Sequence, residues 1–508
     1  MLKKLDNKLL FYIIPFFLGI ITSFSLPPYN YFLLNFFTFP CFLIFYLSNF
    51  NDDKWRSFVI GWLFGFGYFI SNIYWITNSL TFEEIFKPLI PFSFLIIPLF
   101  LGLFYGLITF TFSFLNLKKD YATILIFAVI FSLVEFIRGI VLGGFPWNLI
   151  AYSWSEYTSF LQVLSLIGTY SFNLLSITLF LVPTVIFFDK NLSSKILLII
   201  FSIFFSGVNY YYGETIINKY NKIESINLNT TIKVISPKIN INRFFQNEDP
   251  AIIINELIEL SNPDVKDTIF IFPEGILTGI YLEDLKAYKF IFENSLSKNH
   301  KILIGINSYD NSKVYNSMVV LDNKLNILTK YNKNKLVPFG EFLPFESIFS
   351  KVGFKKITQG YQSFTPASDR DIIEINNIKF LPLICYEIIY SGRLNKKNKE
   401  FNFIINISED GWFGNSIGLY QHFTHSIYRS IEEGKNLIRS ANNGISAYIN
   451  PIGQVINKIE STQKGVIQIK SFKKIDKTIF STQGNKIFFY FLIFYIILIF
   501  FLKKKKTK

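Results

Sequence analysis

Apolar residues crowd into the first ~210 positions and into a last run before the C-terminus, and this distribution restricts the fold more than any other feature. The middle of the chain has the mixed composition of an ordinary soluble domain. A membrane-spanning helix needs about 17–25 mostly apolar residues, and 51% of this 508-residue chain is apolar. The uneven distribution therefore predicts a helical membrane part and a separate folded domain rather than one large core.

Eight apolar runs are candidate spans. They cover approximately residues 9–26, 31–50, 57–77, 88–116, 121–141, 160–188, 196–211 and 486–502. The first run lacks a small-x-small cleavage site and more spans follow it, so we expect it to be retained. The predicted organisation is a transmembrane domain at 1–212, a soluble domain at 220–475, a transmembrane helix at 486–502 and a basic tail at 503–508.

Lysine and arginine in the short connections predict the orientation, because these residues favour the cytoplasmic side of a membrane. With the N-terminus inside, the inner segments carry Lys3, Lys4, Lys8, Lys54, Arg56, Lys118, Lys119, Lys190, Lys195 and the Lys503–Lys508 tail. The outer short connections carry Lys87 and Arg138. The predicted side of the soluble domain depends on whether the seventh run spans the membrane, because this run is short and ends at three tyrosines. The soluble domain that follows it is then expected outside the cytoplasmic membrane.

The net charge of +14 does not favour nucleic acid as a partner. Much of the excess stands in short clusters beside apolar runs, which is typical of contact with anionic lipid headgroups. The two cysteines, Cys41 and Cys385, lie in different parts of the chain, and no disulfide is expected between them. Cys41 falls within an apolar run, where a packing role is expected. Cys385 is therefore free for chemistry.

From about Thr231 to Lys470, short apolar runs alternate with polar turns. Strands are predicted at 231–236, 268–272, 302–306, 314–321, 325–331, 380–384 and 403–407, and helices at 251–260 and 283–297. Helix and strand alternate early and strands dominate later, which indicates a layered α/β or α+β domain.

Polar or reactive residues follow three of these strands directly. The segments are Pro273-Glu274-Gly275, Cys385-Tyr386-Glu387 and Ser408–Gly414. In layered α/β folds, ligand sites collect at the carboxyl ends of strands. We therefore expect Glu274 and Cys385 to lie at one rim of one sheet.

Cys385 is the natural nucleophile of the soluble domain. A free thiol has a pKa of about 8.5, so it needs a base or a cation nearby. The three histidines, His300, His422 and His425, belong to no Cys–His signature. Zinc sites normally need three or four ligands, so no metal is expected. The histidines are expected to be ordinary packing or helix-surface residues.

A carboxylate then has to act as the base and a lysine as its electrostatic partner. Glu274 and Lys333 are candidates, but each has an ordinary alternative. A Pro-Glu-Gly segment after a strand is commonly a turn, and a lysine is commonly a solvated surface residue. Spacing leaves both alternatives open.

Several motifs together resemble a known family. FPEG around Glu274, KYNKNKLVPFGEFLP around Lys333 and LICYE around Cys385 resemble the Glu–Lys–Cys triad of the nitrilase, or carbon–nitrogen hydrolase, superfamily. With NISEDGWFG at 406–414, RSANNGISAYINPIG at 439–453 and the polytopic N-terminal half, the chain resembles the apolipoprotein N-acyltransferase family along essentially its whole length. The resemblance implies a polytopic α-helical membrane domain of about eight spans and an α/β layered (αββα, nitrilase-like) extracytoplasmic domain.

The resemblance also implies roles for individual residues. Glu274 would be the general base, Lys333 the transition-state stabiliser and Cys385 the nucleophile. The supporting residues would be Glu341, Glu387, Asn316, Tyr386 and Trp412. Two positions depart from the family pattern: Lys335 stands where histidine is common, and Glu409 stands where asparagine is common.

The reaction that the resemblance implies is a two-step acyl transfer without a cofactor. A membrane phospholipid would donate a fatty acyl group to Cys385, and the thioester would pass it to the N-terminal amine of a diacylglyceryl-cysteine lipoprotein. Such a reaction follows ping-pong kinetics. The partners would be the phospholipid, the diacylated apolipoprotein and the surrounding lipids, in a bacterial cytoplasmic membrane with the catalytic domain on the periplasmic side.

Two other functions stay open. One is a membrane-anchored amidase of the same superfamily, although eight spans exceed what an anchor needs. The other is a transporter with an accessory domain, since ionisable residues inside spans often mark transport pathways. Glu135 and Arg138 are nearly alone of this kind, and they stand one helical turn apart, a spacing at which they can pair with each other.

Three local features carry further expectations. Residues 342–349, which include Phe345 and Phe349, are expected to form a mobile membrane-facing lid. The stretch from Gly143 to Asn148 is expected to be an interfacial loop, or alternatively part of a lipid-access route. Gly61, Gly65 and Gly67 fall within a predicted span, where glycine allows helices to pack closely.

Overall fold

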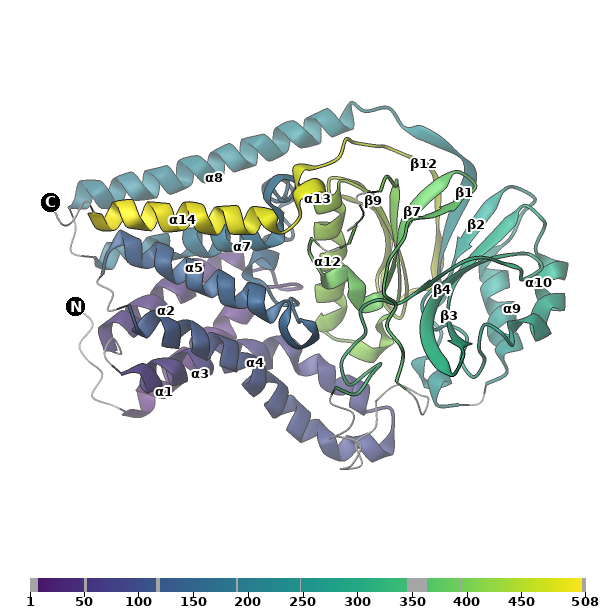
Figure 1. Ribbon diagram of the computed structural model, residues 1–508, viewed down its shortest axis with the longest axis horizontal. Helices are drawn as coiled ribbons and strands as arrows, with labels where there is room; N and C mark the ends of the chain where they lie inside the picture. The colour runs from purple at the N-terminus through teal and green to yellow at the C-terminus, as the bar shows by residue number, and fades with distance from the viewer. Residues whose placement is uncertain are drawn as a thin grey trace. The chain divides into compact units, whose positions relative to one another are not determined.

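The chain divides into two compact units. The computed structural model describes residues 8–49, 53–115, 119–188, 191–246, 248–344, 363–392, 394–395, 397 and 399–504. The helical unit comprises Met1–Thr77, Leu89–Lys219 and Thr478–Lys508, and the sheet unit comprises Asn78–Pro88 and Tyr220–Lys477 (Figure 1). The domain limits drawn from the sequence remain predictions.

The helical unit is built from apolar helices. The longer ones are α1 (Lys8–Ser23), α2 (Asn35–Asn49), α3 (Lys54–Ile73), α4 (Ile90–Ser113), α5 (Tyr121–Arg138), α7 (Leu164–Leu181), α8 (Leu192–Asn221) and α14 (Lys486–Lys504). Within the described residues, seven helical stretches are long and apolar enough to cross a membrane, and a shorter apolar helix lies at Leu9–Ser23. The predicted polytopic helical part is confirmed, and the chain is a multi-pass membrane protein.

One of these helices corrects the sequence analysis. The seventh run was expected to be short, at 196–211, but α8 extends over 30 residues from Leu192 to Asn221. Hydropathy marks where apolar side chains stop, whereas a helix continues for as long as its backbone hydrogen bonds do. The polar and aromatic residues after Val208 keep those bonds, so the helix runs on past the end of the apolar run.

Glycine lets α3 approach two of its neighbours. A side chain at Gly61 would collide with the backbone of Tyr105 in α4, and one at Gly67 would collide with the backbone of Phe16 in α1. The expectation of close helix packing at these glycines is confirmed.

A buried ion pair lies at the end of α5. Arg138 Nη2 is 3.5 Å from Glu135 Oε1, and both side chains are buried. The Tyr105 hydroxyl donates to the same oxygen at 3.0 Å, and Asn173 Nδ2 donates to Glu135 Oε2 at 2.5 Å. Glu135 and Arg138 therefore pair with each other, as their spacing had allowed.

The loop after α5 is tied to this pair. Arg138 donates hydrogen bonds to the carbonyls of Phe145 and, at 3.4 Å, Asn148. Trp147 is buried and its ring packs against that of Trp75, with 4.9 Å between ring centroids. The later part of this loop is therefore tied to the helical unit at Phe145, Trp147 and Asn148, whereas Gly143 at its start is exposed.

Within the part of the chain that the structure describes, the sheet unit contains two six-stranded sheets. The first has the order β12-β1-β2-β3-β4-β5 and the second the order β11-β10-β9-β8-β7-β6. The first comprises β1 (Ile226–Ser236), β2 (Thr268–Ile271), β3 (His300–Asp310), β4 (Lys313–Asp322), β5 (Ile327–Asn332) and β12 (Gly465–Phe472), and the second β6 (Ile373–Ile375), β7 (Ile378–Ile384), β8 (Phe403–Glu409), β9 (Asn436–Asn442), β10 (Ser446–Ile449) and β11 (Val455–Ile459). The pairs β1–β2, β2–β3, β7–β8 and β8–β9 are parallel, and the other pairs are antiparallel.

The two sheets pack face to face, with helices outside them. Ser440 of β9 donates to the carbonyl of Ile235 in β1 at 2.9 Å and to that of Ile271 in β2 at 3.2 Å. Figure 1 shows α9 (Pro250–Ser261) and α10 (Lys289–Ser295) outside the first sheet and α12 (Ile417–Glu433) outside the second. The layer order is thus αββα, and the predicted layered fold is confirmed.

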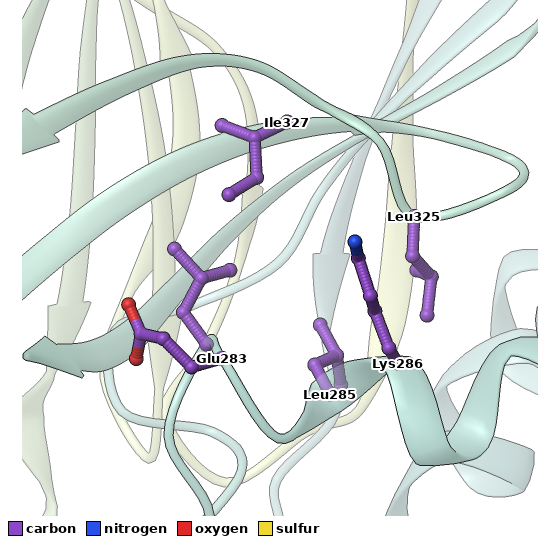
Figure 2. Close-up of a pocket in the computed structure, with 6 residues that line it drawn as sticks. Glu283, Leu285, Lys286, Leu325 and Ile327 are labelled. Atoms are coloured by element: carbon purple, nitrogen blue, oxygen red, sulfur yellow. The ribbon is translucent and has the colours of Figure 1, made fainter.

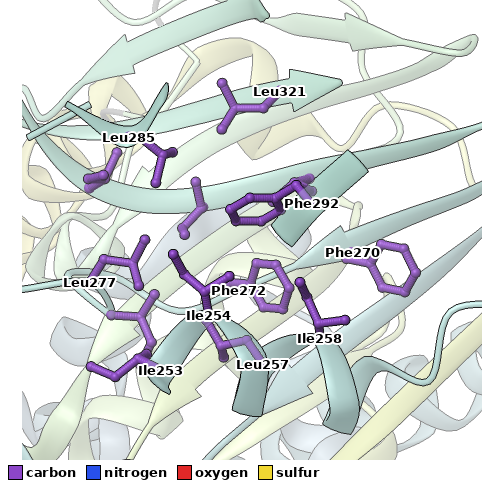
Figure 3. Close-up of a cluster of buried hydrophobic side chains, with 14 of the residues drawn as sticks. Ile253, Ile254, Leu257, Ile258, Phe270, Phe272, Leu277, Leu285, Phe292 and Leu321 are labelled. Carbon is purple, nitrogen blue, oxygen red and sulfur yellow. The ribbon is translucent and has the colours of Figure 1, made fainter. Parts of the chain in front are cut away.

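The outer layer of the first sheet has a dense apolar core. Side chains that recur at helical spacing on α9 point toward the sheet and meet aromatic residues of β2 and α10 (Figure 3). The buried members include Ile253, Ile254, Leu257, Ile258, Phe270, Phe272 and Phe292. This burial anchors β2, the strand that leads directly into Glu274.

The predicted elements of the sheet unit all have somewhat different limits in the structure, and two of the differences have a clear local cause. The helix expected at 283–297 is instead a 3-10 turn at Leu285–Tyr288 followed by α10. The amide of Leu282 bonds to the carbonyl of Asn307 in β3, which holds the chain extended before the helix. The strand expected at 403–407 continues to Glu409, because Ser408 and Glu409 pair with Ala441 and Asn442 of β9.

Candidate active site

Cys385 stands at the sharp turn that follows β7. Its φ of +49° lies in the left-handed region, which is strained for a residue other than glycine. A 3-10 turn at Cys385–Ile389 begins there, and the side chain is 8% exposed. Strain of this kind persists where the surrounding structure enforces it, and it concentrates at functional sites.

Glu274 follows β2 of the first sheet, whereas Cys385 follows β7 of the second. The expectation that both lie at one rim of one sheet is therefore wrong. The two strand ends come together because the two sheets pack face to face. The backbone N–H of Glu409, at the end of β8 in the second sheet, donates to Glu274 Oε2 at 2.9 Å. Strand pairing could not have revealed this contact, since the two sheets share no hydrogen-bonded strands.

Lys333 follows β5 and is buried between two carboxylates. Its Nζ lies 3.2 Å from Glu274 Oε1 and 2.9 Å from Glu341 Oε1. Asn316 of β4 donates to the same two oxygens, at 2.8 Å to Glu274 and 2.7 Å to Glu341. One ammonium and one amide thus hold two carboxylates together in a site from which water is largely excluded.

The site shifts the pKa of two of its groups. Burial by itself would lower the pKa of Lys333, but the carboxylates of Glu274 and Glu341 raise it well above its usual range. Burial, and after it the charge of Glu274, raise the pKa of the Cys385 thiol well above its usual range, against the opposing effect of Lys333. At neutral pH the lysine is charged and the thiol is protonated. The thiol therefore needs a base before it can attack.

Glu387 connects the lysine loop to the turn at Cys385. Its Oε2 accepts from the Ile384 amide at 2.9 Å, and its Oε1 accepts from the Tyr331 hydroxyl at 2.7 Å. The same Oε1 accepts from Arg370 at 2.6 Å and from the amide of Lys335 at 3.2 Å. Glu387 thus positions the backbone on both sides of the site.

Trp412 belongs to an aromatic cluster at this end of the sheet unit. Its ring contacts those of Phe244 at 5.1 Å and Phe82 at 5.7 Å, measured between centroids. Phe82 comes from the segment Asn78–Pro88, which joins the sheet unit although it precedes α4 in sequence. Asn78 of that segment donates to the carbonyl of Phe413 at 2.6 Å.

Tyr386 and Lys335 both lie near the ring of Tyr390. The Tyr386 ring meets that of Tyr390 edge-on at 5.5 Å, and the Lys335 ammonium lies 5.9 Å from the Tyr390 ring centroid. The Lys335 ammonium is thus placed over an aromatic face. Residues 345–349 of the expected lid lie outside the described residues.

A second buried network was missed by the sequence analysis. Asp410 accepts from Ser408 at 2.6 Å and from Arg439 at 2.7 Å, and it lies 3.0 Å from His422 Nδ1. Burial by itself would raise the pKa of Asp410, but Arg439 and His422 lower it. Arg439 also bonds to Asn406, whose amide reaches the carbonyl of Cys385 at 3.5 Å.

His422 is therefore not a helix-surface residue, and it participates in the packing beneath the nucleophile. His425, one turn further along α12, is also buried. No spacing rule links Asp410, His422 and Arg439 in the sequence. The one available signal was the position of Asp410 directly after β8, whereas His422 lies within α12 and Arg439 within β9. Among the described residues, no cluster of three or more His, Cys, Asp or Glu side chains could hold a metal ion.

A separate cavity of about 300 Å³ lies elsewhere in the sheet unit (Figure 2). Apolar side chains from the segment before α10 and from the β4–β5 turn line it, together with Glu283 and Lys286. None of the candidate site residues contributes to its lining. The chemistry suggested by the sequence is therefore not located in this cavity.

Two protein families match the chain, one in its N-terminal part and one in its C-terminal part. Residues 18–181 match the apolipoprotein N-acyltransferase N-terminal domain, and residues 261–471 match the carbon–nitrogen hydrolase domain. A carbon–nitrogen hydrolase superfamily protein from Xanthomonas campestris has a structure similar to part of the chain, with a TM-score of 0.35, 15% identity and coverage of 49% of this chain and 91% of that one. This last likeness is too weak to add to the argument.

The αββα unit and the polytopic helices define a membrane-embedded protein with a carbon–nitrogen hydrolase domain. An apolipoprotein N-acyltransferase from Allorhizobium ampelinum is 30% identical over 88% of this chain and 87% of its own length. One from Rickettsia typhi is 32% identical over 93% of this chain and 94% of its own length. The chain belongs to the apolipoprotein N-acyltransferase family.

Proposed function

We propose that this protein transfers a fatty acyl group from a membrane phospholipid, through a thioester on Cys385, to the N-terminal amine of a diacylglyceryl-cysteine lipoprotein. The observation that supports the proposal is a carboxylate–ammonium–carboxylate cluster whose charges act on the buried thiol of Cys385, which stands at a strained turn of the backbone. Glu274 and Lys333 are close enough to Cys385 for their charges to act on its thiol. Membership of the N-acyltransferase family supports the class of reaction.

In the first step, Glu274 takes the proton of the Cys385 thiol, and the thiolate sulfur attacks the ester carbonyl of the phospholipid. Lys333, which is charged, stabilises the negative oxygen that forms, an effect that can contribute several kcal/mol in a water-excluded site. The carbon–oxygen bond then breaks. The lysophospholipid leaves with the proton held by Glu274, and the acyl group stays on sulfur.

In the second step, the amine of the acceptor attacks the thioester. Glu274 takes a proton from the attacking nitrogen, the carbon–sulfur bond breaks, and the proton returns to the sulfur of Cys385. Asn316 and Glu341 keep Glu274 and Lys333 in place throughout. Because one site serves both substrates in turn, the kinetics are ping-pong.

The test is the intact mass of the purified protein after incubation with phosphatidylethanolamine. We expect an acyl-sized increase that hydroxylamine removes, because thioesters are cleaved by it. Cys385→Ala should lack the adduct, and Cys41→Ala, the matched control, should keep it. Absence of any adduct on the unaltered protein, with ammonia release from small amides, would favour the amidase instead.

We also propose that the sheet unit lies on the periplasmic side of a bacterial cytoplasmic membrane. The support is the distribution of lysine and arginine in the short connections. A membrane-impermeant thiol reagent should label a cysteine placed at the exposed Lys313 in intact spheroplasts, in a Cys41→Ala background. Labelling only after lysis would reverse the orientation.

A further inference from the structure

Arg243 and Glu409 form a buried ion pair beside the candidate site. Arg243 Nη2 lies 2.5 Å from Glu409 Oε2, and the two side chains are 0% and 1% exposed. Arg243 belongs to the 3-10 turn Ile241–Phe244, and Glu409 ends β8. An isolated charge buried in this way is strongly disfavoured, so each residue requires the other.

Arg243 holds the backbone directly after Glu274. Its Nη2 donates to the carbonyl of Gly275 at 3.1 Å, and its Nε donates to that of Ile276 at 3.2 Å. The Thr278 hydroxyl donates a hydrogen bond to the carbonyl of Arg243 at 3.0 Å. The guanidinium therefore fixes the course of the loop that presents Glu274.

Glu409 holds the side chain of Glu274. Its backbone N–H donates to Glu274 Oε2 at 2.9 Å. The position of that N–H is itself fixed, because the Glu409 side chain accepts from the Gly411 amide at 2.9 Å and from Asn442 Nδ2 at 2.7 Å. The two members of the ion pair thus act on Glu274 in two ways. Arg243 holds the backbone that follows Glu274, and Glu409 holds the Glu274 carboxylate.

We infer that the Arg243–Glu409 pair is a positioning device of this chain, which fixes the Glu274 carboxylate so that its other oxygen faces Lys333. The inference rests on the proposed function, in which Glu274 is the base. Neither member of the pair acts on substrate. They determine where Oε1 of Glu274 stands relative to the thiol, and misplacement of a catalytic group by about 1 Å can cost on the order of 100-fold in rate.

One substitution can distinguish a role of Arg243 in positioning from a role in charge balance alone. Guanidinium presents several donors in a rigid fork, whereas an ammonium is a single point charge on a flexible stem. Arg243→Lys keeps the positive charge opposite Glu409 but cannot reach both loop carbonyls and the carboxylate together. A role in charge balance would survive this change, and a role in positioning would not.

The experiment compares rates of Cys385 acylation in the full-length protein with phosphatidylethanolamine in detergent micelles, followed by intact mass. Arg243→Lys should lower the rate at saturating donor by about 100-fold, while the donor concentration for half-maximal rate changes by less than about twofold. The matched control is Lys233→Met. Lys233 is a buried cation that bonds to the carbonyls of Ser261 and Asn262, away from Glu274, so its removal should leave the rate unchanged.

A second variant guards against loss of folding. Arg243→Leu combined with Glu409→Asn removes both charges, so no buried charge is left unpaired, and we expect it to fold and still to acylate slowly. Wild-type rates in this variant or in Arg243→Lys would overturn the inference, as would an equal loss in Lys233→Met. If the unaltered protein itself forms no adduct, the proposed function fails, which is a distinct result.

Discussion

The helical unit and the sheet unit each bury a carboxylate beside a cation, but the charges balance in one cluster and not in the other. In the helical unit, Glu135 faces one guanidinium, that of Arg138, and its remaining acceptor sites are filled by neutral donors. In the sheet unit, the single ammonium of Lys333 faces two carboxylates, Glu274 and Glu341.

The difference separates a structural cluster from one suited to proton transfer. The Glu135–Arg138 pair is balanced in charge, and it holds the loop after α5 through the bonds of Arg138 to the carbonyls of Phe145 and Asn148. Glu274 and Glu341 share the one ammonium of Lys333, so the two negative charges of this cluster are matched by a single positive charge. In the proposed mechanism, the Cys385 thiol, whose pKa is raised, supplies a proton to Glu274 of this cluster.

The largest expected effect comes from removing the base of the unbalanced cluster. Glu274→Gln should lower the rate of Cys385 acylation by about 10²- to 10⁴-fold, the usual contribution of a general base. Its melting temperature should not fall, because Lys333 retains Glu341 as a partner. Quench-flow intact mass gives the rate and thermal unfolding gives the stability. If Glu274→Gln unfolded at a lower temperature but acylated at the normal rate while folded, Glu274 would have a structural role and the comparison of the two clusters would be reversed.

The balanced cluster should respond in the opposite way. Glu135→Gln leaves the guanidinium of Arg138 buried without a carboxylate, and breaking a buried pair costs about 3–5 kcal/mol. Thermal unfolding in detergent should show this loss, with acylation per folded molecule close to normal. Replacing both Glu135 and Arg138 by leucine should recover part of the stability. Normal stability with slow acylation would show that this cluster also serves the reaction.

A smaller effect concerns the thiol and its response to pH. Because the pKa of Cys385 is raised, its thiolate fraction at neutral pH is low, and alkylation by iodoacetamide should keep accelerating above pH 9. In Glu274→Gln the negative charge is gone, so the thiol pKa falls and the alkylation curve moves to lower pH. The measurement uses a Cys41→Ala background. A curve that moves to higher pH would contradict the proposed charge relation.

Much of the fold could be predicted because it depends on local patterns. Runs of about 20 apolar residues predict spanning helices, since unsatisfied backbone groups are costly in lipid. Strands such as β3, β4 and β7 followed from their apolar runs. The limits of α8 and β8 could not be predicted, because they depend on hydrogen bonds that continue where hydropathy stops.

The residues of the candidate site could be proposed from the sequence, but the way the fold brings them together could not. Glu274, Lys333 and Cys385 were proposed from their motifs, and the structure places Lys333 within 3.2 Å of Glu274, with both charges acting on the Cys385 thiol. The contact of Glu274 with Glu409 joins positions 135 residues apart on different sheets. No periodicity or spacing rule connects such positions.

By itself, the sequence determined which segments are apolar enough to leave water and which residue types are available for chemistry, because both depend on composition and local order. The tertiary structure decided that two sheets, rather than one, supply the reactive groups. It also decided that an arginine from one turn neutralises the extra carboxylate of Glu409. Such pairings arise when distant segments are buried together, since a charge acts on whatever the fold places next to it.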